Sequence, residues 1–199
     1  MPAIAPFVTE VDFSSGALSA PDYIIQRKLS DMAAMYADRD EAARILAEEG
    51  DRLIYEVQGR ELPEEEGQIP HCTTRILPGR IGAEYHMTKG HYHARREQGE
   101  VYFGLSGRGC LVMQTEAGET SVQDMVAGSA AYVPPYWAHR TVNIGDEDFV
   151  FFSVWEARAG HDYGTIERDG FRLLLLMRND GPRAIASKLV ERKRQKGSI

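Results

Sequence analysis

Residues 88–105 read TKGHYHARREQGEVYFGL, and residues 128–143 read GSAAYVPPYWAHRTVN. The first stretch holds His91 and His93, and the second holds His139 shortly after the rigid pair Pro134-Pro135. Alternate side chains of a strand point to the same face of a sheet, so His91 and His93 can address one point in space. These stretches therefore predict a site at which histidines from distant parts of the chain converge on a framework of strands.

A carboxylate completes the set of donors. Glu100 follows His93 by seven residues, and the polar stretch between them ends in glycine, so the chain can fold back and bring the two side chains together. Three neutral imidazoles and one carboxylate suit Fe, Mn, Zn, Ni or Cu divalent ions and leave coordination positions open. The predicted metal ligands are His91, His93, Glu100 and His139.

The chain around these motifs has the pattern of an antiparallel β protein. From Leu53 onward, short apolar or alternating runs recur about every 8 to 12 positions, separated by turn residues. This spacing indicates a sandwich or barrel rather than alternating βαβ units. The sequence lacks the glycine-rich strand-to-helix loop of a P-loop or Rossmann site, so a nucleotide site is not expected. Strands are expected at 53–57, 85–92, 101–105, 110–114, 130–133 and 149–155.

The first third of the chain is polar and more helical in pattern. Asp38 or Asp40 can cap a helix over residues 41–49, which ends at Gly50. Residues 23–29 are ambiguous, because their apolar positions fit either a helix or a strand.

The composition fits one globular domain. The chain has 199 residues, 43% of them hydrophobic, and a net charge of −7. This balance argues against nucleic acid or an anionic membrane as a partner, and an anionic substrate would need a locally positive pocket. No apolar run approaches the ~18 residues that span a bilayer. With two cysteines and no apparent leader, a reduced cytoplasmic protein is expected.

The histidine motifs resemble the two signature motifs of the cupin superfamily. Glu100 comes later than the general motif places its glutamate, and Tyr136 replaces the usual glycine. Glu97 has the more usual spacing and is a rival ligand, but its polar turn favours an exposed side chain. The matching residues are Gly90-His91-Tyr92-His93, Glu100 and Gly107, then Gly128, Pro134, His139 and Asn143.

A narrower resemblance covers residues 73–166. This stretch is similar to the cupin-type glucose-6-phosphate isomerases of archaea and some bacteria, most specifically over residues 132–143 and 160–165. The resemblance implies a mainly β fold, a double-stranded β-helix (cupin jelly roll) with a few short peripheral helices. It also implies a homodimer that interconverts glucose 6-phosphate and fructose 6-phosphate in glycolysis and gluconeogenesis.

The expected single structural domain has three parts. Residues 1–52 form a helical and extended segment packed on the barrel, and residues 53–166 form the cupin β-barrel. Residues 167–199 form a strand and a basic helical tail, in which residues 183–199 carry six basic residues against one acid. We interpret the tail as a solvated terminal helix.

The resemblance further implies which residues act on the substrate. The catalytic positions match Glu100, as a base, and His161, near the ring-opening step. A carboxylate bound to a dication is less basic, so either Glu100 detaches and a metal-bound enediolate forms, or the hydrogen moves as a hydride shift. Lys89 is an added candidate for the phosphate. The substrate-binding positions match Tyr55, Thr74, Thr88, Gly90, Tyr102, Tyr136 and Tyr163.

One divalent metal per subunit is expected, with Fe(II) favoured over Mn(II), Zn(II) or Ni(II). An alternative is a cupin non-haem Fe(II) dioxygenase, since the same donors activate oxygen, and another is a sugar-binding or storage cupin without turnover. The threonines and tyrosines around the motifs favour a phosphosugar substrate over the apolar one expected for a dioxygenase.

Overall fold

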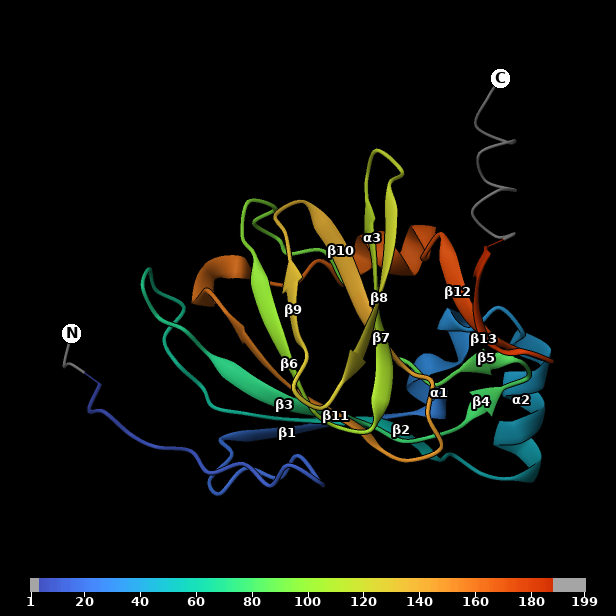
Figure 1. Cartoon of the computed structure of the whole chain (residues 1–199), viewed down its shortest axis with the longest axis horizontal. Coiled ribbons are helices and arrows are strands. Elements are labelled where there is room, and N and C mark those ends of the chain that lie inside the picture. Colours follow the sequence, from blue (N-terminus) through green and yellow to red (C-terminus); the bar gives the residue numbers. More distant parts are fainter. Residues whose placement is uncertain (1–3, 188–199) are drawn as a thin grey trace.

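Three antiparallel sheets form the framework of the computed structural model, which describes residues 4–187 (Figure 1). The largest has the order β1 (Tyr23–Lys28), β2 (Leu53–Gly59), β3 (His71–Ile76), β11 (Phe149–Trp155), β6 (Glu100–Ser106) and β9 (Ala130–Val133). The second has the order β10 (Trp137–Asn143), β7 (Arg108–Thr115) and β8 (Thr120–Val126). The smallest has the order β13 (Gly181–Ala186), β12 (Leu173–Arg178), β5 (Glu84–Tyr85) and β4 (Arg80–Ile81).

The two larger sheets share one core, which confirms the predicted mainly β jelly roll. In β6 the buried residues alternate with exposed ones, so that Glu100, Tyr102 and Gly104 face inward. Position 104 requires glycine, because a Cβ there would lie 2.2 Å from the carbonyl oxygen of Val126. Leu111 of β7 is fully buried in the same cluster, so side chains from both sheets fill the interior.

Short helices lie beside this barrel, as predicted. They are α1 (Leu29–Met32), η1 (Ala33–Met35), α2 (Arg39–Glu48), η2 (Ala157–Ala159) and α3 (Tyr163–Asp169). Asp38 caps α2 by accepting a hydrogen bond from the Glu41 N–H at 3.0 Å, so the helix begins two residues before its predicted start. The ambiguous stretch at 23–29 resolves mainly into strand β1, which pairs with β2.

The predicted continuous strand over residues 85–92 is wrong. β5 ends at Tyr85, and beyond it the segment forms only isolated bridges, which join Met87 to Val142, His91 to His139 and Tyr92 to Asp162. Gly90 has a φ of 74°, which interrupts an extended run. The segment nevertheless follows β10, and this course carries its histidines to His139.

The three-part division of the chain stays a prediction, although β1 and β2 pair across the proposed boundary at residue 52. Residues 188–199, and with them most of the basic tail, lie outside the described residues. Within residues 4–187, no helix is long and apolar enough to cross a membrane.

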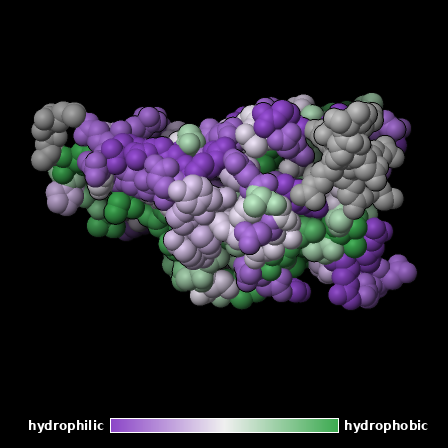
Figure 2. All heavy atoms as spheres, turned by 90° about the horizontal axis from the view of Figure 1, so that it is seen from above, coloured by the Kyte–Doolittle hydropathy of each residue, from purple (hydrophilic) through white to green (hydrophobic). Residues whose placement is uncertain are grey.

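The outer surface has one markedly apolar side. Seen from above in Figure 2, hydrophobic residues gather along the lower left and middle of the view, while the upper edge is mostly hydrophilic. Val101 and Phe103 of β6 are 42% and 41% exposed, and Tyr132 of β9 is 60% exposed. Val101 and Tyr132 are directly opposite each other in the β6–β9 register, so these side chains form one patch.

Candidate metal centre

The four predicted ligands converge from separate elements. Glu100 begins β6, His139 lies in β10, and His91 and His93 lie on the irregular segment beside β10. Glu100 Oε2 is 3.2 Å from His93 Nε2 and 3.0 Å from His139 Nε2. One ligand atom of each residue lies within 4.8 Å of the others.

The orientation of the rings fits a cation. His93 Nδ1 is 2.9 Å from the Gln98 carbonyl oxygen, and His139 Nδ1 is 3.3 Å from the Trp137 carbonyl oxygen. A carbonyl only accepts, so these Nδ1 atoms carry the protons and the Nε2 lone pairs face the cluster. The Nε2 atom of His91 is buried without a hydrogen-bond partner in the described part of the chain, and the buried Nε2 atom of His139 has only the Glu100 carboxylate beside it, at 3.0 Å. Buried acceptors without donors are costly unless a cation binds them.

The protonation states of His91 and Glu100 suit the same ion. Burial, and then the neighbouring histidines, hold the pKa of His91 well below its ordinary value, so its ring is neutral. Burial alone would raise the pKa of Glu100, but the adjacent side chains of His139 and His93 lower it below its usual value. A neutral imidazole and an ionised carboxylate are the forms that bind divalent metals.

Gly90 permits the close approach of these segments. A Cβ at this position would lie 2.9 Å from the His139 carbonyl oxygen and 2.7 Å from the Arg140 Cβ, and its φ is positive. Only glycine tolerates both the positive φ and the close contacts without strain. The packing of the two segments therefore explains why glycine occupies position 90.

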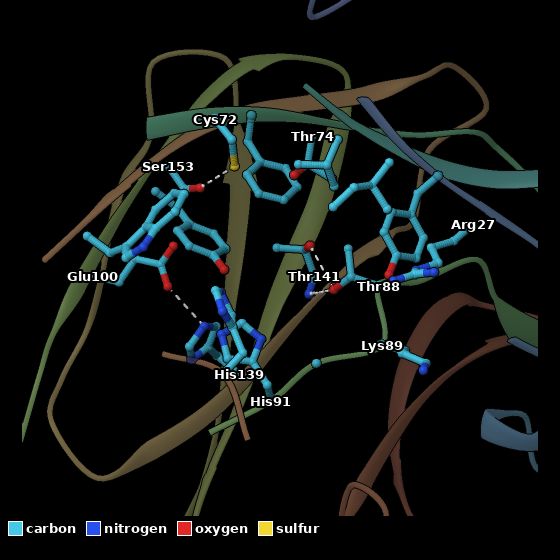
Figure 3. A pocket seen from close by; sticks show the side chains of 18 of the residues that line it. Arg27, Cys72, Thr74, Thr88, Lys89, His91, Glu100, His139, Thr141 and Ser153 are labelled. Atoms are coloured by element: carbon cyan, nitrogen blue, oxygen red, sulfur yellow. Dashed lines mark hydrogen bonds and ion pairs between the residues drawn. The ribbon is translucent and has the colours of Figure 1, made fainter. Parts of the chain in front are cut away.

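A cavity of about 460 Å³ opens beside the ligands. Figure 3 shows Glu100, His91 and His139 toward one end and Arg27, Thr88 and Lys89 toward the other. This size and mixed lining suit a small polar ligand. Six of the seven predicted substrate residues line the cavity, together with His161: Tyr55, Thr74, Thr88, Gly90, Tyr102 and Tyr163.

Tyr136 is not brought together with the others. It lies in the turn between β9 and β10 with a φ of 70°, and it is 61% exposed. Its N–H donates to the Arg96 carbonyl oxygen. Its role in substrate binding stays a prediction that the cavity does not support.

His161 lies against the histidine cluster. Its ring centroid is 4.5 Å from that of His91, and it stacks on Tyr163 with an interplanar angle of 9°. Asp162 fixes this loop by capping α3 and by pairing with Arg96 at 2.6 Å. Burial lowers the pKa of His161, so the ring is neutral near pH 7.

The rival ligand Glu97 does not join the cluster. It pairs with Arg95 at the surface, as expected.

Several cavity residues escaped the sequence analysis. Thr141 follows His139 by two positions on β10, so strand alternation could have indicated it. Arg27 follows Tyr23 and Ile25 by the same alternation, but the stretch was not assigned to a strand. Cys72 hydrogen-bonds Ser153 at 3.2 Å, and no motif marks either residue. The remaining ones are Val57, Glu61, Phe151 and Trp155.

Two antiparallel sheets around a cluster of three histidines and one glutamate, in this order and spacing, define a cupin. Within that class, a family model described as "Glucose-6-phosphate isomerase (GPI)" matches residues 26–189. The chain belongs to this glucose-6-phosphate isomerase family, and the predicted family and enzyme class are thereby confirmed.

Individual relatives agree. The chain is 44% identical to a "Glucose-6-phosphate isomerase" of Thermococcus litoralis over 174 residues, which cover 87% of this chain and 90% of that protein. It is 45% identical to one of Pyrococcus horikoshii, over 87% of this chain and 91% of that protein. A bacterial relative from Sinorhizobium medicae is 36% identical over 83% of this chain and 77% of that protein.

Solved structures give a weaker likeness. A structure of oxalate decarboxylase matches with a TM-score of 0.42 and 24% identity, over 51% of this chain and 26% of that chain. The Lactobacillus farciminis oxalate decarboxylase matches with a TM-score of 0.44 and 20% identity, over 55% of this chain and 30% of that chain. We draw nothing about function from likeness at this level.

Proposed function

We propose that this protein interconverts glucose 6-phosphate and fructose 6-phosphate, as a step of glycolysis and gluconeogenesis, with one divalent metal ion held by His91, His93, Glu100 and His139. The observation that carries this proposal is the convergence of these four donors at one end of a cavity that holds hydroxyls and cations at its other end. Membership of the isomerase family supports the reaction.

When bound, a divalent ion would supply a Lewis acid for the negative charge that develops on two neighbouring sugar oxygens. The chain's own residues prepare this end of the site. The Gln98 and Trp137 carbonyls fix the rings of His93 and His139, and Glu100 stays ionised between them. His161 is neutral and adjoins His91, so it can accept or return a proton at the ring oxygen of a bound sugar.

The hydrogen that moves between C1 and C2 has two routes. In the first, Glu100 or His161 takes it as a proton and an enediolate forms; in the second, it passes directly between the carbons as a hydride. We favour the first because both candidate bases line the cavity. Turnover of fructose 6-phosphate in D2O should then place deuterium at C2 of the product. A product free of deuterium, with exchange at the base shown to be fast, would favour the hydride shift.

Fe(II) is the metal we propose, because three imidazoles with one carboxylate are a suitable donor set; Mn(II), Zn(II) and Ni(II) suit it as well. The direct test is a coupled assay that converts fructose 6-phosphate and detects glucose 6-phosphate, before and after strong chelation. Activity should disappear with the metal and return with Fe(II) or Mn(II). Full activity in rigorously metal-free protein would overturn the metal dependence. Oxygen uptake without isomerisation would instead favour the dioxygenase alternative.

The homodimer is also part of this proposal. The apolar patch of Val101, Phe103 and Tyr132 offers a surface that a second copy could cover. Light scattering should give twice the chain mass, and Phe103→Lys should shift it toward the monomer. The two buried free cysteines agree with a reducing compartment, and we therefore place the protein in the cytoplasm.

A further inference from the structure

The inner face of β1 forms one wall of the cavity. Tyr23, Ile25 and Arg27 alternate along this strand and all line the cavity, whereas the intervening Ile24 is 54% exposed. In the register of β1 with β2, Arg27 lies opposite Tyr55, which also lines the cavity. The edge strand of the large sheet thus carries a cation into the site.

Two cations line the cavity, and their surroundings differ. Lys89 Nζ is 2.8 Å from Glu167 Oε1 on α3, outside the cavity lining, and 5.8 Å from the centroid of the Tyr163 ring. Arg27 forms no ion pair with any carboxylate of residues 4–187. The positive charge of Lys89 is therefore offset within the protein, while that of Arg27 is available to a ligand.

Hydroxyl groups surround the same end of the cavity. Thr88 Oγ1 accepts the Thr141 N–H at 3.1 Å and lies 3.4 Å from Thr141 Oγ1. Figure 3 shows Thr88 between Thr141 and Arg27, on the side of the cavity away from Glu100. Burial outweighs the opposite effects of Lys89 and Arg27 and raises the pKa of Tyr55 to about 12, so its hydroxyl keeps its proton at neutral pH.

We propose that Arg27 binds the phosphate group of the substrate and that Lys89 instead anchors α3 through Glu167. This inference rests on the proposed function, because it assigns one end of that site. A guanidinium presents a planar fork of N–H donors that matches phosphate oxygens, and its charge attracts a dianion into a protein of net charge −7. The cavity then selects phosphorylated sugars over free sugars.

The test compares Arg27→Gln with Lys28→Gln, which removes the same charge from the exposed next residue of the strand. Arg27→Gln should raise KM for fructose 6-phosphate by about 10- to 100-fold, as expected for loss of a charge-assisted hydrogen bond, with a smaller change in kcat. The inhibition constant of inorganic phosphate should rise in parallel, and metal content should stay the same. Lys28→Gln should leave all of these values unchanged.

Two further variants keep the inference falsifiable. Arg27→Lys retains the charge without the fork, so its KM should lie between those of the parent and Arg27→Gln. Lys89→Gln should raise KM less than Arg27→Gln does. If Arg27→Gln kept the KM of Lys28→Gln, or if Lys89→Gln raised KM more than Arg27→Gln, this inference would be overturned. The proposed function would still stand. Absence of isomerisation in the parent protein would instead reject the proposed function.

Discussion

Two consecutive residues of β10 belong to two buried polar clusters that differ in their balance of charge. His139 is 1% exposed and faces Glu100 and the other metal-ligand candidates. Arg140 is 2% exposed on the opposite face, where it lies 3.8 Å from Glu84 Oε1 and donates to the Leu173 carbonyl oxygen at 3.1 Å. The first cluster gathers acceptors around one negative charge, while the second contains both a cation and an anion. Under the proposed function, only the first cluster would bind an ion from outside the chain.

The pKa values of the two buried glutamates, Glu84 and Glu100, shift in opposite directions. Burial raises the pKa of Glu84 despite the neighbouring Arg140 charge and the hydrogen bond from the Ala37 N–H. Glu100 has its pKa lowered by the histidines around it, although it too is buried. Glu100 is thus held as an anion, whereas Glu84 has one cation 3.8 Å away and one hydrogen bond from the Ala37 N–H. Burial by itself therefore does not identify a functional carboxylate; the nature of its neighbours does.

The largest expected effect comes from breaking the first cluster. His139→Ala removes one of the proposed ligands. Loss of a residue that only supports a ligand typically lowers metal affinity by about 10- to 100-fold, and loss of His139 should lower it by more. Isomerase activity should fall by at least about 100-fold. Metal content by elemental analysis and the isomerase assay would measure this, while circular dichroism should show the β fold retained.

His71→Ala is the matched control, because His71 begins β3 outside the cavity lining and its ring packs 5.4 Å from that of Phe152. It should keep its full metal content. If His139→Ala also kept its metal, the fourth donor would lie elsewhere and the comparison of the two clusters would lose its basis.

The second cluster should respond in stability rather than in metal binding. Glu84→Ala leaves the Arg140 charge buried without its partner, which should cost about 3–5 kcal/mol in the free energy of unfolding. Urea unfolding would measure this, and metal content per folded molecule should match the parent. Replacing both residues, as Glu84→Leu with Arg140→Met, should recover part of the loss, because no unpaired charge remains.

The partly exposed pair of Arg75 and Asp148, 3.5 Å apart, provides the control. Asp148→Ala should cost only about 0–1 kcal/mol, as surface ion pairs usually do. Equal losses for Glu84→Ala and Asp148→Ala would show that burial adds nothing to the Glu84–Arg140 pair.

Local patterns in the sequence were sufficient to predict α2, with its capping Asp38. The predicted convergence of His91, His93, Glu100 and His139 rested on their spacing and on the cupin resemblance, and it holds although His91 and His93 lie on an irregular segment instead of a continuous strand. The partners of Glu84 and Arg140 were not predictable, because their contact depends on how the small sheet with β5 packs beside β10. No local pattern marks such a long-range pair.

Two other differences also have long-range causes. Pairing with β2 makes residues 23–28 a strand although their apolar spacing also fits a helix, and this pairing brings Arg27 into the cavity. The run at 85–92 reads as a strand, but close packing of Gly90 against His139 and Arg140 requires a positive φ there. In both cases a distant part of the chain overrides the local preference.

The smallest expected effect concerns a third charged pair, Arg96 with Asp162, which lies beside the site but is partly exposed. Hydrogen bonds from Arg96 and Thr165 lower the pKa of Asp162 from 3.8 to about 2. A lowered pKa in the folded state means that this stabilisation is complete above about pH 4 and is lost as the pH falls through about 2. Asp162→Asn keeps a residue able to cap α3 and should cost no more than about 1 kcal/mol at pH 7.

Asp162→Ala also removes the cap and should cost roughly 1 kcal/mol more. Urea unfolding of the parent and Asp162→Asn between pH 7 and pH 2 should show the difference shrinking as the pH falls. A loss at Asp162 as large as that at Glu84, or one independent of pH, would contradict the distinction between buried and partly exposed charge pairs. The expected ranking arises because water already solvates part of the Arg96–Asp162 pair, so that little is gained by forming it and little is lost by breaking it.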